Sequence, residues 1–286
     1  MTEPLFTLSA FADEYDPSLA KQLAGLRENG ITLIEPRFAD GKNISDLNDD
    51  EAAQLRDRLD AAGIGISALG SPLGKIRITD PMEPPLEKLV RTLKTAKILG
   101  AARIRMFSFF IPEGEHEKWR DEVMRRLALM LEMAEGEGIT LCHENEKGIW
   151  GDTPERCLAI CNEFGGRMPL VFDHANFIDC GVEPYPYAFS LLKGKFAYLH
   201  IKDSIGNCQY YPAGKGACRI PETLRDLAAE GKPYILTLEP HLKVFSGMAA
   251  LEKEDSAATK EKNTYASNAE AFRAAADALK QIISEL

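Results

Sequence analysis

The sequence predicts an α/β protein of the (β/α)8 class, a TIM barrel that forms one domain over residues 1–286. Three observations support this prediction. A short β-rich run, a polar or Gly/Pro loop and a segment with helical spacing recur in that order eight times. The runs are spaced at the length of a βα unit, and no composition shift marks a linker. A doubly wound open sheet is the alternative fold, but no GxGxxG follows the first run.

The expected strands are rich in β-branched, aromatic and aliphatic residues and are bounded by loop-forming residues. In chain order they are 5–11, 31–37, 64–70, 102–109, 139–145, 169–176, 196–203 and 234–241. Between them, the segment 152–166 is typical of a helix, with Thr153 as N-cap, Pro154 at the first helical position and glycines at its end. The segments 18–30 and 85–100 also end in glycine and carry leucines on one stripe.

Composition limits the class of protein. The chain has 286 residues, of which 45% are hydrophobic and 27% charged, typical of a globular protein. Its first residues lack the pattern of a signal peptide, and no window approaches the roughly 20 apolar residues of a membrane span. A net charge of −10 opposes binding to nucleic acid or anionic membranes. We therefore expect a cytoplasmic protein with a small-molecule partner, and leave a homo-oligomer open.

The cysteines show no CxxC pairing, and Cys157 and Cys161 merely share a helix face. We expect reduced, partly buried thiols, because disulfides are rare in cytosolic chains of this length. The six positions are Cys142, Cys157, Cys161, Cys180, Cys208 and Cys218.

Charged residues stand where several expected strands end. In a barrel these ends carry the active site. Side-chain alternation points one residue from each of the last four strands inward: Glu144, Asp173, His200 and Glu239. Three clustered carboxylates would repel one another unless a cation lies among them, so we expect one divalent metal ion. Oxygen ligands with one imidazole suit Mn²⁺ or Mg²⁺, with Co²⁺, Fe²⁺ or Zn²⁺ possible. Taken singly, each residue could instead be solvated or paired with Lys147 or Lys202.

These residues resemble the xylose isomerase-like barrel superfamily of sugar and sugar-phosphate isomerases and epimerases, hydroxypyruvate isomerase, inosose dehydratase and endonuclease IV. The resemblance extends from Phe6 to the last helix and is most specific in "HEN", "FDHANF", "HIKD" and "LEPH". It implies a metal held by a Glu, an Asp, a His and a Glu from four successive strands, which match the four residues above. One departure is Asn176, which stands where ketose epimerases of this type carry a substrate-contacting His. The spare imidazole is His174, expected to face away.

The constellation predicts a metal-dependent isomerase or epimerase that acts on a small sugar, ketose or sugar phosphate through a cis-enediolate. Glu144 and Glu239 are the expected catalytic acid and base. A lyase of the keto-inositol dehydratase type is the alternative, because it uses the same enediolate, and a non-catalytic ligand-binding barrel is a further one. A nuclease of the endonuclease IV type is disfavoured, because the chain has five histidines and a net charge of −10.

Cations are frequent where loops should surround the barrel mouth: Arg37, Lys75, Arg77, Arg105, Lys147, Lys202, Lys215 and Lys243. They indicate a phosphate or carboxylate on the substrate, unless they balance Glu35, Asp203 and Glu146. Lys202 is expected beside the metal at the mouth, meeting the substrate. The full set of expected substrate-binding residues is Lys202, Asn176, Arg37, Glu35, His241 and Arg105.

Three further segments carry weaker expectations. The glycines of 212–221 predict a flexible closing loop or an anion-binding nest of backbone N–H groups. The aromatic run 106–110 is expected to pack in the core, and 241–262 to form a lid or a solvated insertion.

Overall fold

The structure, a computed structural model, describes residues 4–248 and 265–286. Seven parallel strands form one curled sheet in the order β1-β13-β10-β9-β8-β7-β6. Their bounds are β1 (Phe6–Ala10), β6 (Leu69–Gly70), β7 (Arg103–Met106), β8 (Thr140–Glu144), β9 (Leu170–Asp173), β10 (Phe196–Ile201) and β13 (Tyr234–Leu238). Every one of these strands lies inside one of the predicted β-rich runs.

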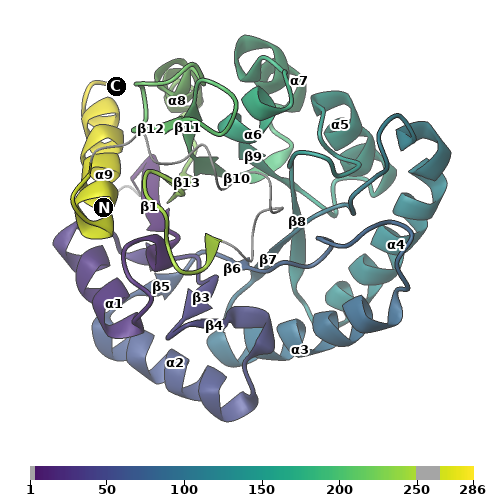
Figure 1. The fold of residues 1–286 in the computed structure, drawn as a ribbon, viewed down its shortest axis with the longest axis horizontal. Helices are drawn as coiled ribbons and strands as arrows, with labels where there is room; N and C mark the ends of the chain where they lie inside the picture. The colour runs from purple at the N-terminus through teal and green to yellow at the C-terminus, as the bar shows by residue number, and fades with distance from the viewer. Residues whose placement is uncertain (1–3, 249–264) are drawn as a thin grey trace.

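The second predicted run forms β2 (Leu33–Ile34), which lies between the two edges of this sheet, β1 on one side and the run that contains β6 on the other. β2 pairs in parallel with β5 (Gly65–Ile66), which precedes β6 in the third predicted run. On the other side, the backbone N–H of Glu35 donates to the carbonyl of Ala10 at the end of β1, at 3.0 Å. The strands therefore close into a barrel. Helices surround this barrel, as Figure 1 shows. The predicted TIM barrel is confirmed.

The helices of the described residues lie outside the strands (Figure 1). They are α1 (Leu19–Glu28), α2 (Asp49–Ala62), α3 (Glu83–Leu99), α4 (His116–Gly136), α5 (Pro154–Glu163), α6 (His174–Asp179), α7 (Phe189–Leu192), α8 (Ile220–Ala228) and α9 (Asn268–Ser284). The predicted cap of α5 is present, because the Thr153 side chain accepts the N–H of Arg156. α3 ends at Gly100, whose φ of 68° is a left-handed conformation that glycine adopts without strain.

Short elements complete the chain. They are η1 (Ala12–Glu14), η2 (Ile44–Asp46), η3 (Pro184–Ala188), β3 (Phe38–Ala39), β4 (Lys42–Asn43), β11 (Asp203–Ser204) and β12 (Tyr210–Tyr211). β11 and β12 form an antiparallel pair directly after β10.

The sixth predicted strand was too long. It was expected to reach Asn176, but β9 ends at Asp173 and α6 begins at His174. The reason is local, because the Asp173 carboxylate accepts the backbone N–H of Asn176 at 2.8 Å and so caps the new helix. Asp173 therefore ends a strand and begins a helix.

The barrel interior holds a small apolar cluster of Ala68, Cys142, Val171 and Tyr198. The next residue on the same face of β8 is Glu144, and on β9 it is Asp173. The alternation that packs this cluster therefore directs polar side chains to the C-terminal end of the barrel.

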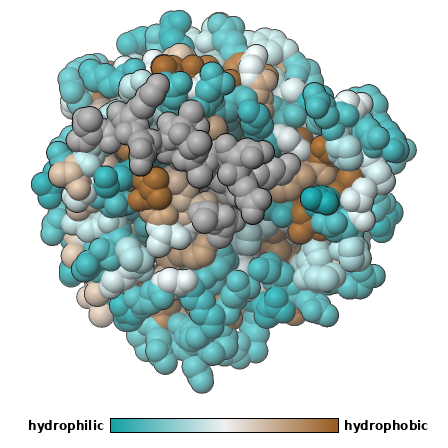
Figure 2. All heavy atoms as spheres, in the orientation of Figure 1, coloured by the Kyte–Doolittle hydropathy of each residue, from teal (hydrophilic) through white to brown (hydrophobic). Residues whose placement is uncertain are grey.

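The large hydrophobic core lies between the strands and the helices, and it includes Phe109 of the aromatic run. All six cysteines are free thiols, as predicted. Figure 2 shows that one face of the molecule is mostly hydrophilic, with small hydrophobic patches. Among the described residues, no helix has the length and apolar character needed to cross a membrane.

Candidate active site

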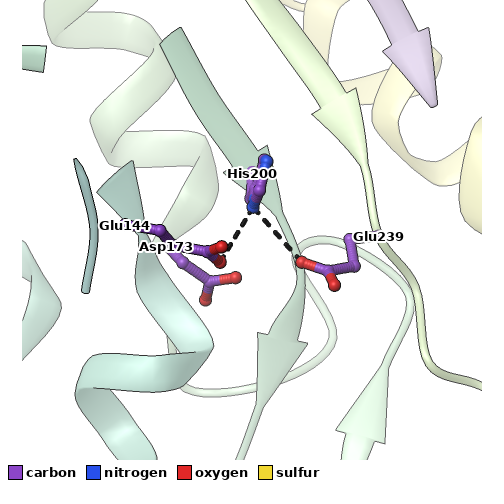
Figure 3. A group of neighbouring side chains, drawn as sticks. All are labelled: Glu144, Asp173, His200 and Glu239. Carbon is purple, nitrogen blue, oxygen red and sulfur yellow. Dashed lines mark hydrogen bonds and ion pairs between the residues drawn. The ribbon is translucent and has the colours of Figure 1, made fainter. Parts of the chain in front are cut away.

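Four side chains from successive barrel strands converge at one point (Figure 3). Glu144 ends β8, Asp173 ends β9, His200 lies in β10 and Glu239 follows β13. Each offers one potential ligand atom, these atoms lie within 4.8 Å of one another, and all four residues are buried. The structure thus brings together the four residues that the sequence singled out as metal ligands.

His200 lies between carboxylates on both sides of its ring. Its Nδ1 is 2.9 Å from Glu144 Oε1 and 3.3 Å from Glu239 Oε2. Its Nε2 is 3.2 Å from Glu35 Oε2. Burial by itself lowers the pKa of His200, but the charges of Glu144 and Glu35 raise it well above its usual value. A positive charge on the His200 ring is thereby favoured and would partly neutralise the neighbouring carboxylates.

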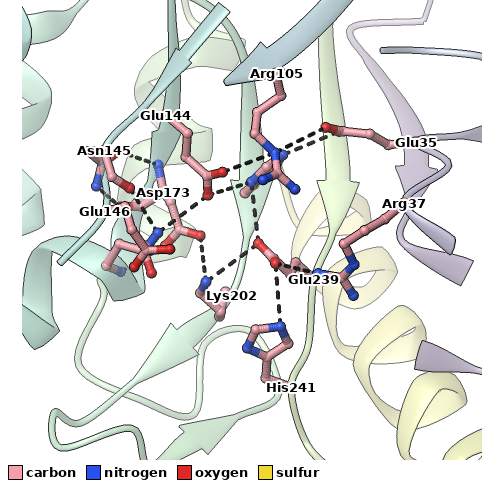
Figure 4. A network of polar contacts seen from close by, with 12 residues as sticks. Glu35, Arg37, Arg105, Glu144, Asn145, Glu146, Asp173, Lys202, Glu239 and His241 are labelled. Carbon is pink, nitrogen blue, oxygen red and sulfur yellow. Dashed lines mark hydrogen bonds and ion pairs between the residues drawn. The ribbon is translucent and has the colours of Figure 1, made fainter. Parts of the chain in front are cut away.

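Lys202 lies beside the candidate metal ligands. Its Nζ is 3.0 Å from Asp173 Oδ2 and 3.4 Å from Glu239 Oε2, inside the carboxylate cluster (Figure 4). The side chain is buried. The cause is electrostatic, because two carboxylates that lie close together attract the flexible ammonium inward. Burial raises the pKa of Asp173 to about 7, although Lys202 opposes that rise.

Arg37 is buried on the β1 side of the cluster. Its Nε is 3.0 Å from Asp13 Oδ2, and its Nη1 is 3.0 Å from Glu239 Oε1. The guanidinium lies over the ring of Phe11 at 4.3 Å and over that of Phe245 at 4.8 Å. Arg37 therefore fixes one oxygen of Glu239 and leaves the other, Oε2, directed toward His200 and Lys202.

Arg105 is buried on the opposite side. Its Nε is 3.2 Å from Glu144 Oε2, and its Nη1 donates to the carbonyl of Ser71 at 3.2 Å. The arginines that the sequence assigned to substrate binding thus lie against carboxylates of the protein itself.

A second group of possible ligands shares Glu239 with the first and adds Glu14 and His241. His241 Nε2 lies 3.4 Å from both Glu14 Oε1 and Glu239 Oε1. Burial lowers the pKa of His241 to about 3 and raises that of Glu14 to about 8. Sequence reasoning missed Asp13 and Glu14. The signal that would have found them is their position directly after the first predicted strand.

Glu35 and Asn176 contact ligand candidates. Glu35 accepts the hydroxyl of Tyr198 at 2.9 Å on one oxygen and meets His200 on the other. Asn176 Nδ2 donates to Glu144 Oε1 at 3.3 Å and to the carbonyl of Asn145 at 2.8 Å. Tyr198, which sequence reasoning also missed, is two residues before His200 on the same strand face.

The other cations expected at the mouth are dispersed. Lys75 Nζ lies 2.8 Å from Glu146 Oε2 and 4.4 Å from the centre of the Phe107 ring. Lys243 donates to the carbonyl of Tyr265 at 3.0 Å. Arg77, Lys147 and Lys215 are exposed.

The nest predicted in 212–221 is present, but it binds the protein's own Asp203. The Asp203 carboxylate accepts the N–H groups of Gly214, Gly216 and Cys218 at 2.7 to 3.0 Å. Most of the expected lid, from residue 249 to 262, lies outside the described residues.

Comparisons with known proteins agree with the fold. The model of the xylose isomerase-like TIM barrel family matches residues 23–282. The chain is similar to the solved IolI protein with a bound zinc atom, at a TM-score of 0.73 and 18% identity, covering 98% of each chain. It is also similar to L-ribulose 3-epimerase, with a TM-score of 0.72 and 19% identity over 98% of this chain and 94% of that chain.

A third similar structure is the probable 3-DHS dehydratase AsbF from Bacillus anthracis. The TM-score is 0.70 and the identity 16%, over 97% of this chain and 99% of that chain. No curated protein matches the chain. At these identities the similarity to the solved structures shows a shared fold only, and it carries no information about a shared activity.

Proposed function

Because the chain belongs to the xylose isomerase-like TIM barrel family, we propose that it is a divalent-metal-dependent isomerase or epimerase of a small sugar, ketose or sugar phosphate. The observation that carries the proposal is the convergence of Glu144, Asp173, His200 and Glu239 within 4.8 Å. A similar solved structure is an epimerase of L-ribulose, which agrees with this substrate class.

The charges around this point fit a divalent cation. Six buried carboxylates adjoin one another there, and the permanent cations among the described residues that contact them are Arg37, Arg105 and Lys202. The carboxylates are Asp13, Glu14, Glu35, Glu144, Asp173 and Glu239. His200 adds a further positive charge, and Glu14, whose pKa burial raises to about 8, is largely protonated at neutral pH. A divalent ion held by the carboxylates would take over the charge that the His200 proton supplies, because a metal-ligating histidine must be neutral. Oxygen ligands with one imidazole favour Mn²⁺ or Mg²⁺, with Co²⁺, Fe²⁺ or Zn²⁺ as alternatives.

The surroundings of His200 support its role as a ligand. Metal-ligating histidines usually place their second ring nitrogen against a carboxylate or carbonyl. Here Nδ1 faces Glu144 and Glu239, while Nε2 contacts Glu35 at 3.2 Å.

The arrangement favours one ion rather than two. The oxygens of Glu14 and Glu239 that face His241 are also contacted by Arg37, at 3.3 and 3.0 Å. A guanidinium therefore already supplies positive charge at the second group.

The reaction follows from the positions of the two glutamates. A bound divalent ion would polarise the substrate carbonyl and acidify the neighbouring C–H group. Glu144 and Glu239 lie on either side of His200 (Figure 3), so one can remove this proton and the other can return it. Return to the adjacent carbon is isomerisation through a cis-enediolate, and return to the opposite face is epimerisation. Positioned acid and base groups contribute about 10² to 10⁴ in rate.

A lyase remains the second candidate. The same enediolate can expel a neighbouring hydroxyl as water, and one similar structure is described as a probable dehydratase. A cytoplasmic location and the lack of nucleic-acid and membrane partners stay predictions.

Elemental analysis of the purified and Mn²⁺-reloaded protein tests the metal assignment. We expect about one ion per chain in the wild type, and its loss in the Asp173→Ala, His200→Ala double variant. The matched control is Asp152→Ala, His116→Ala, which removes the same residue types from an ion pair of 3.4 Å elsewhere. Stoichiometric metal that survives in the first double variant would overturn the assignment.

The activity is tested by incubating the metal-loaded protein in D₂O with ketoses, ketose phosphates and keto-inositols. Deuterium uptake at a carbon next to the carbonyl supports the isomerase or epimerase. Loss of water from the substrate supports the lyase.

A further inference from the structure

Lys202 contacts the two ligand candidates through the oxygens that the backbone and Arg37 do not hold, one of which, Glu239 Oε2, also lies 3.3 Å from His200 Nδ1. Asp173 Oδ1 already accepts the backbone N–H of Asn176, and Lys202 lies 3.0 Å from the other oxygen, Oδ2. Glu239 Oε1 is held by Arg37, and Lys202 lies 3.4 Å from Oε2. The ammonium therefore lies against one oxygen of each of two candidate ligands, where it would compete with a divalent ion.

We propose that Lys202 is a built-in counter-cation, which neutralises Asp173 and Glu239 in the ion-free protein and is displaced when the divalent ion binds. This inference rests on the proposed function. Oxygen ligands lie within about 2.0 to 2.6 Å of Mg²⁺ or Ca²⁺, so an ion and an ammonium that share both oxygens would be close enough to repel strongly.

Lys202 is the cation best suited to leave. Arg37 is held by Asp13 and Glu14 as well as Glu239, and its guanidinium lies between two aromatic rings. Arg105 is anchored by the carbonyl of Ser71. Lys202, by contrast, carries a compact ammonium on a flexible chain.

An aromatic ring already lies near the ammonium of Lys202. The ring of Tyr210 lies 5.9 Å from its Nζ, so a polarisable face is near the ammonium if it leaves the carboxylates. Once the ion has displaced it, the ammonium of Lys202 is free to contact the substrate, as the sequence predicted.

The test is a Mn²⁺ titration of the metal-free protein. Binding is measured by calorimetry and by competition with a chromophoric chelator. We expect Lys202→Met to bind Mn²⁺ at least about tenfold more tightly than the wild type, because the ion no longer competes with an ammonium. The matched control is Lys147→Met, which removes the same charge from an exposed side chain and should bind within about twofold of wild type. Equal or weaker binding by Lys202→Met would overturn the inference.

A failure of the proposed function gives a different result, because neither the wild type nor any variant would then bind Mn²⁺ stoichiometrically. Should Lys202→Met not fold without metal, Lys202→Gln replaces it, since its amide can still donate to Asp173 without carrying charge. The same tightening is expected for Lys202→Gln, whereas Lys202→Arg keeps the positive charge and should not tighten binding. Tightening by Lys202→Arg equal to that of Lys202→Gln would contradict competition between the charges.

Discussion

At the scale of single residues, Glu35 has a different position from the one expected of a substrate-binding residue. It is fully buried, with Oε2 against His200 Nε2 and Oε1 accepting the Tyr198 hydroxyl. Burial raises the pKa of Glu35, but the charges of His200 and Arg105 and the hydrogen bonds from His200 and Tyr198 together outweigh burial, and the net shift is downward. An ionised Glu35 can hold the imidazole ring so that Nδ1 faces Glu144 and Glu239, and we propose that Glu35 is a positioning residue.

Glu35→Gln should lower the affinity for Mn²⁺ by about 10- to 100-fold, because a neutral amide is a poorer partner for the ring N–H of a ligand histidine. The measurement is the same ion titration with chelator competition. Tyr198→Phe serves as the graded control, since it removes one hydrogen bond from Glu35 and leaves the carboxylate, so its effect should be smaller. Unchanged affinity in Glu35→Gln would show that Glu35 does not act through His200.

At the scale of elements, the segment after β10 is fixed by one carboxylate. Asp203 of β11 accepts three N–H groups from residues 214–218 and a fourth from Ser204 at 3.0 Å. Gly216 lies so close that a Cβ atom there would come within 2.3 Å of Asp203 Oδ1. These contacts hold residues 214–218 against β11, so the structure favours the predicted nest of backbone N–H groups over the predicted flexible closing loop.

Asp203→Asn should loosen this loop, because an amide has one acceptor oxygen where the carboxylate has two. Each hydrogen bond to a charged group contributes about 1.5 to 3 kcal/mol, so we expect a loss of about 3 kcal/mol in the free energy of unfolding. Hydrogen exchange should become faster at the amides of residues 214–218. The control is Asp277→Asn on the exposed face of α9, which should change neither quantity. Wild-type exchange in Asp203→Asn would contradict the role of this carboxylate.

At the scale of the whole molecule, two histidines are buried beside the strands that form the site. His143 Nε2 lies 2.9 Å from Ser108 Oγ, and His174 Nε2 lies 3.1 Å from Thr223 Oγ1. Burial lowers the pKa of both to about 3, because the charged imidazolium would lose its solvation. Both rings are therefore neutral in the folded protein at neutral pH, and the ring of His174 contacts Phe172.

This burial makes the fold sensitive to acid. Below pH about 6.5 the unfolded chain binds protons at these histidines while the folded chain does not, so stability falls as the pH drops toward 3. Each of these two histidines should lower the free energy of unfolding by about 2 kcal/mol as the pH falls from 6.5 to 5. His174→Gln, whose amide can still meet Thr223, should lose about 2 kcal/mol less than wild type over that interval.

The measurement is denaturant unfolding at both pH values with a chelator present, because metal affinity is itself pH-dependent. His116→Gln removes a histidine that is only partly buried and serves as the control. An acid-induced loss in His174→Gln equal to that of wild type would show that this ring does not govern the pH dependence.

The amino-acid sequence was sufficient to predict the barrel and the convergence of Glu144, Asp173, His200 and Glu239. Side chains alternate along each strand, and the strand ends are equivalent in a closed barrel. These two facts bring together the side chains of Glu144, Asp173, His200 and Glu239. Strand and helix boundaries were less secure, because the cap that ends β9 depends on the rotamer of Asp173.

The pairing of the charges, by contrast, became clear from the three-dimensional arrangement of the side chains. Arg37 contacts Glu239 across 202 positions of the chain, and the sequence offers both residues several other partners. Which cation meets which carboxylate depends on side-chain reach across the barrel and on which oxygens the backbone has already taken. This is why Lys202 lies among the carboxylates, why Glu35 lies behind His200, and why Arg37 connects Asp13 and Glu14 to Glu239.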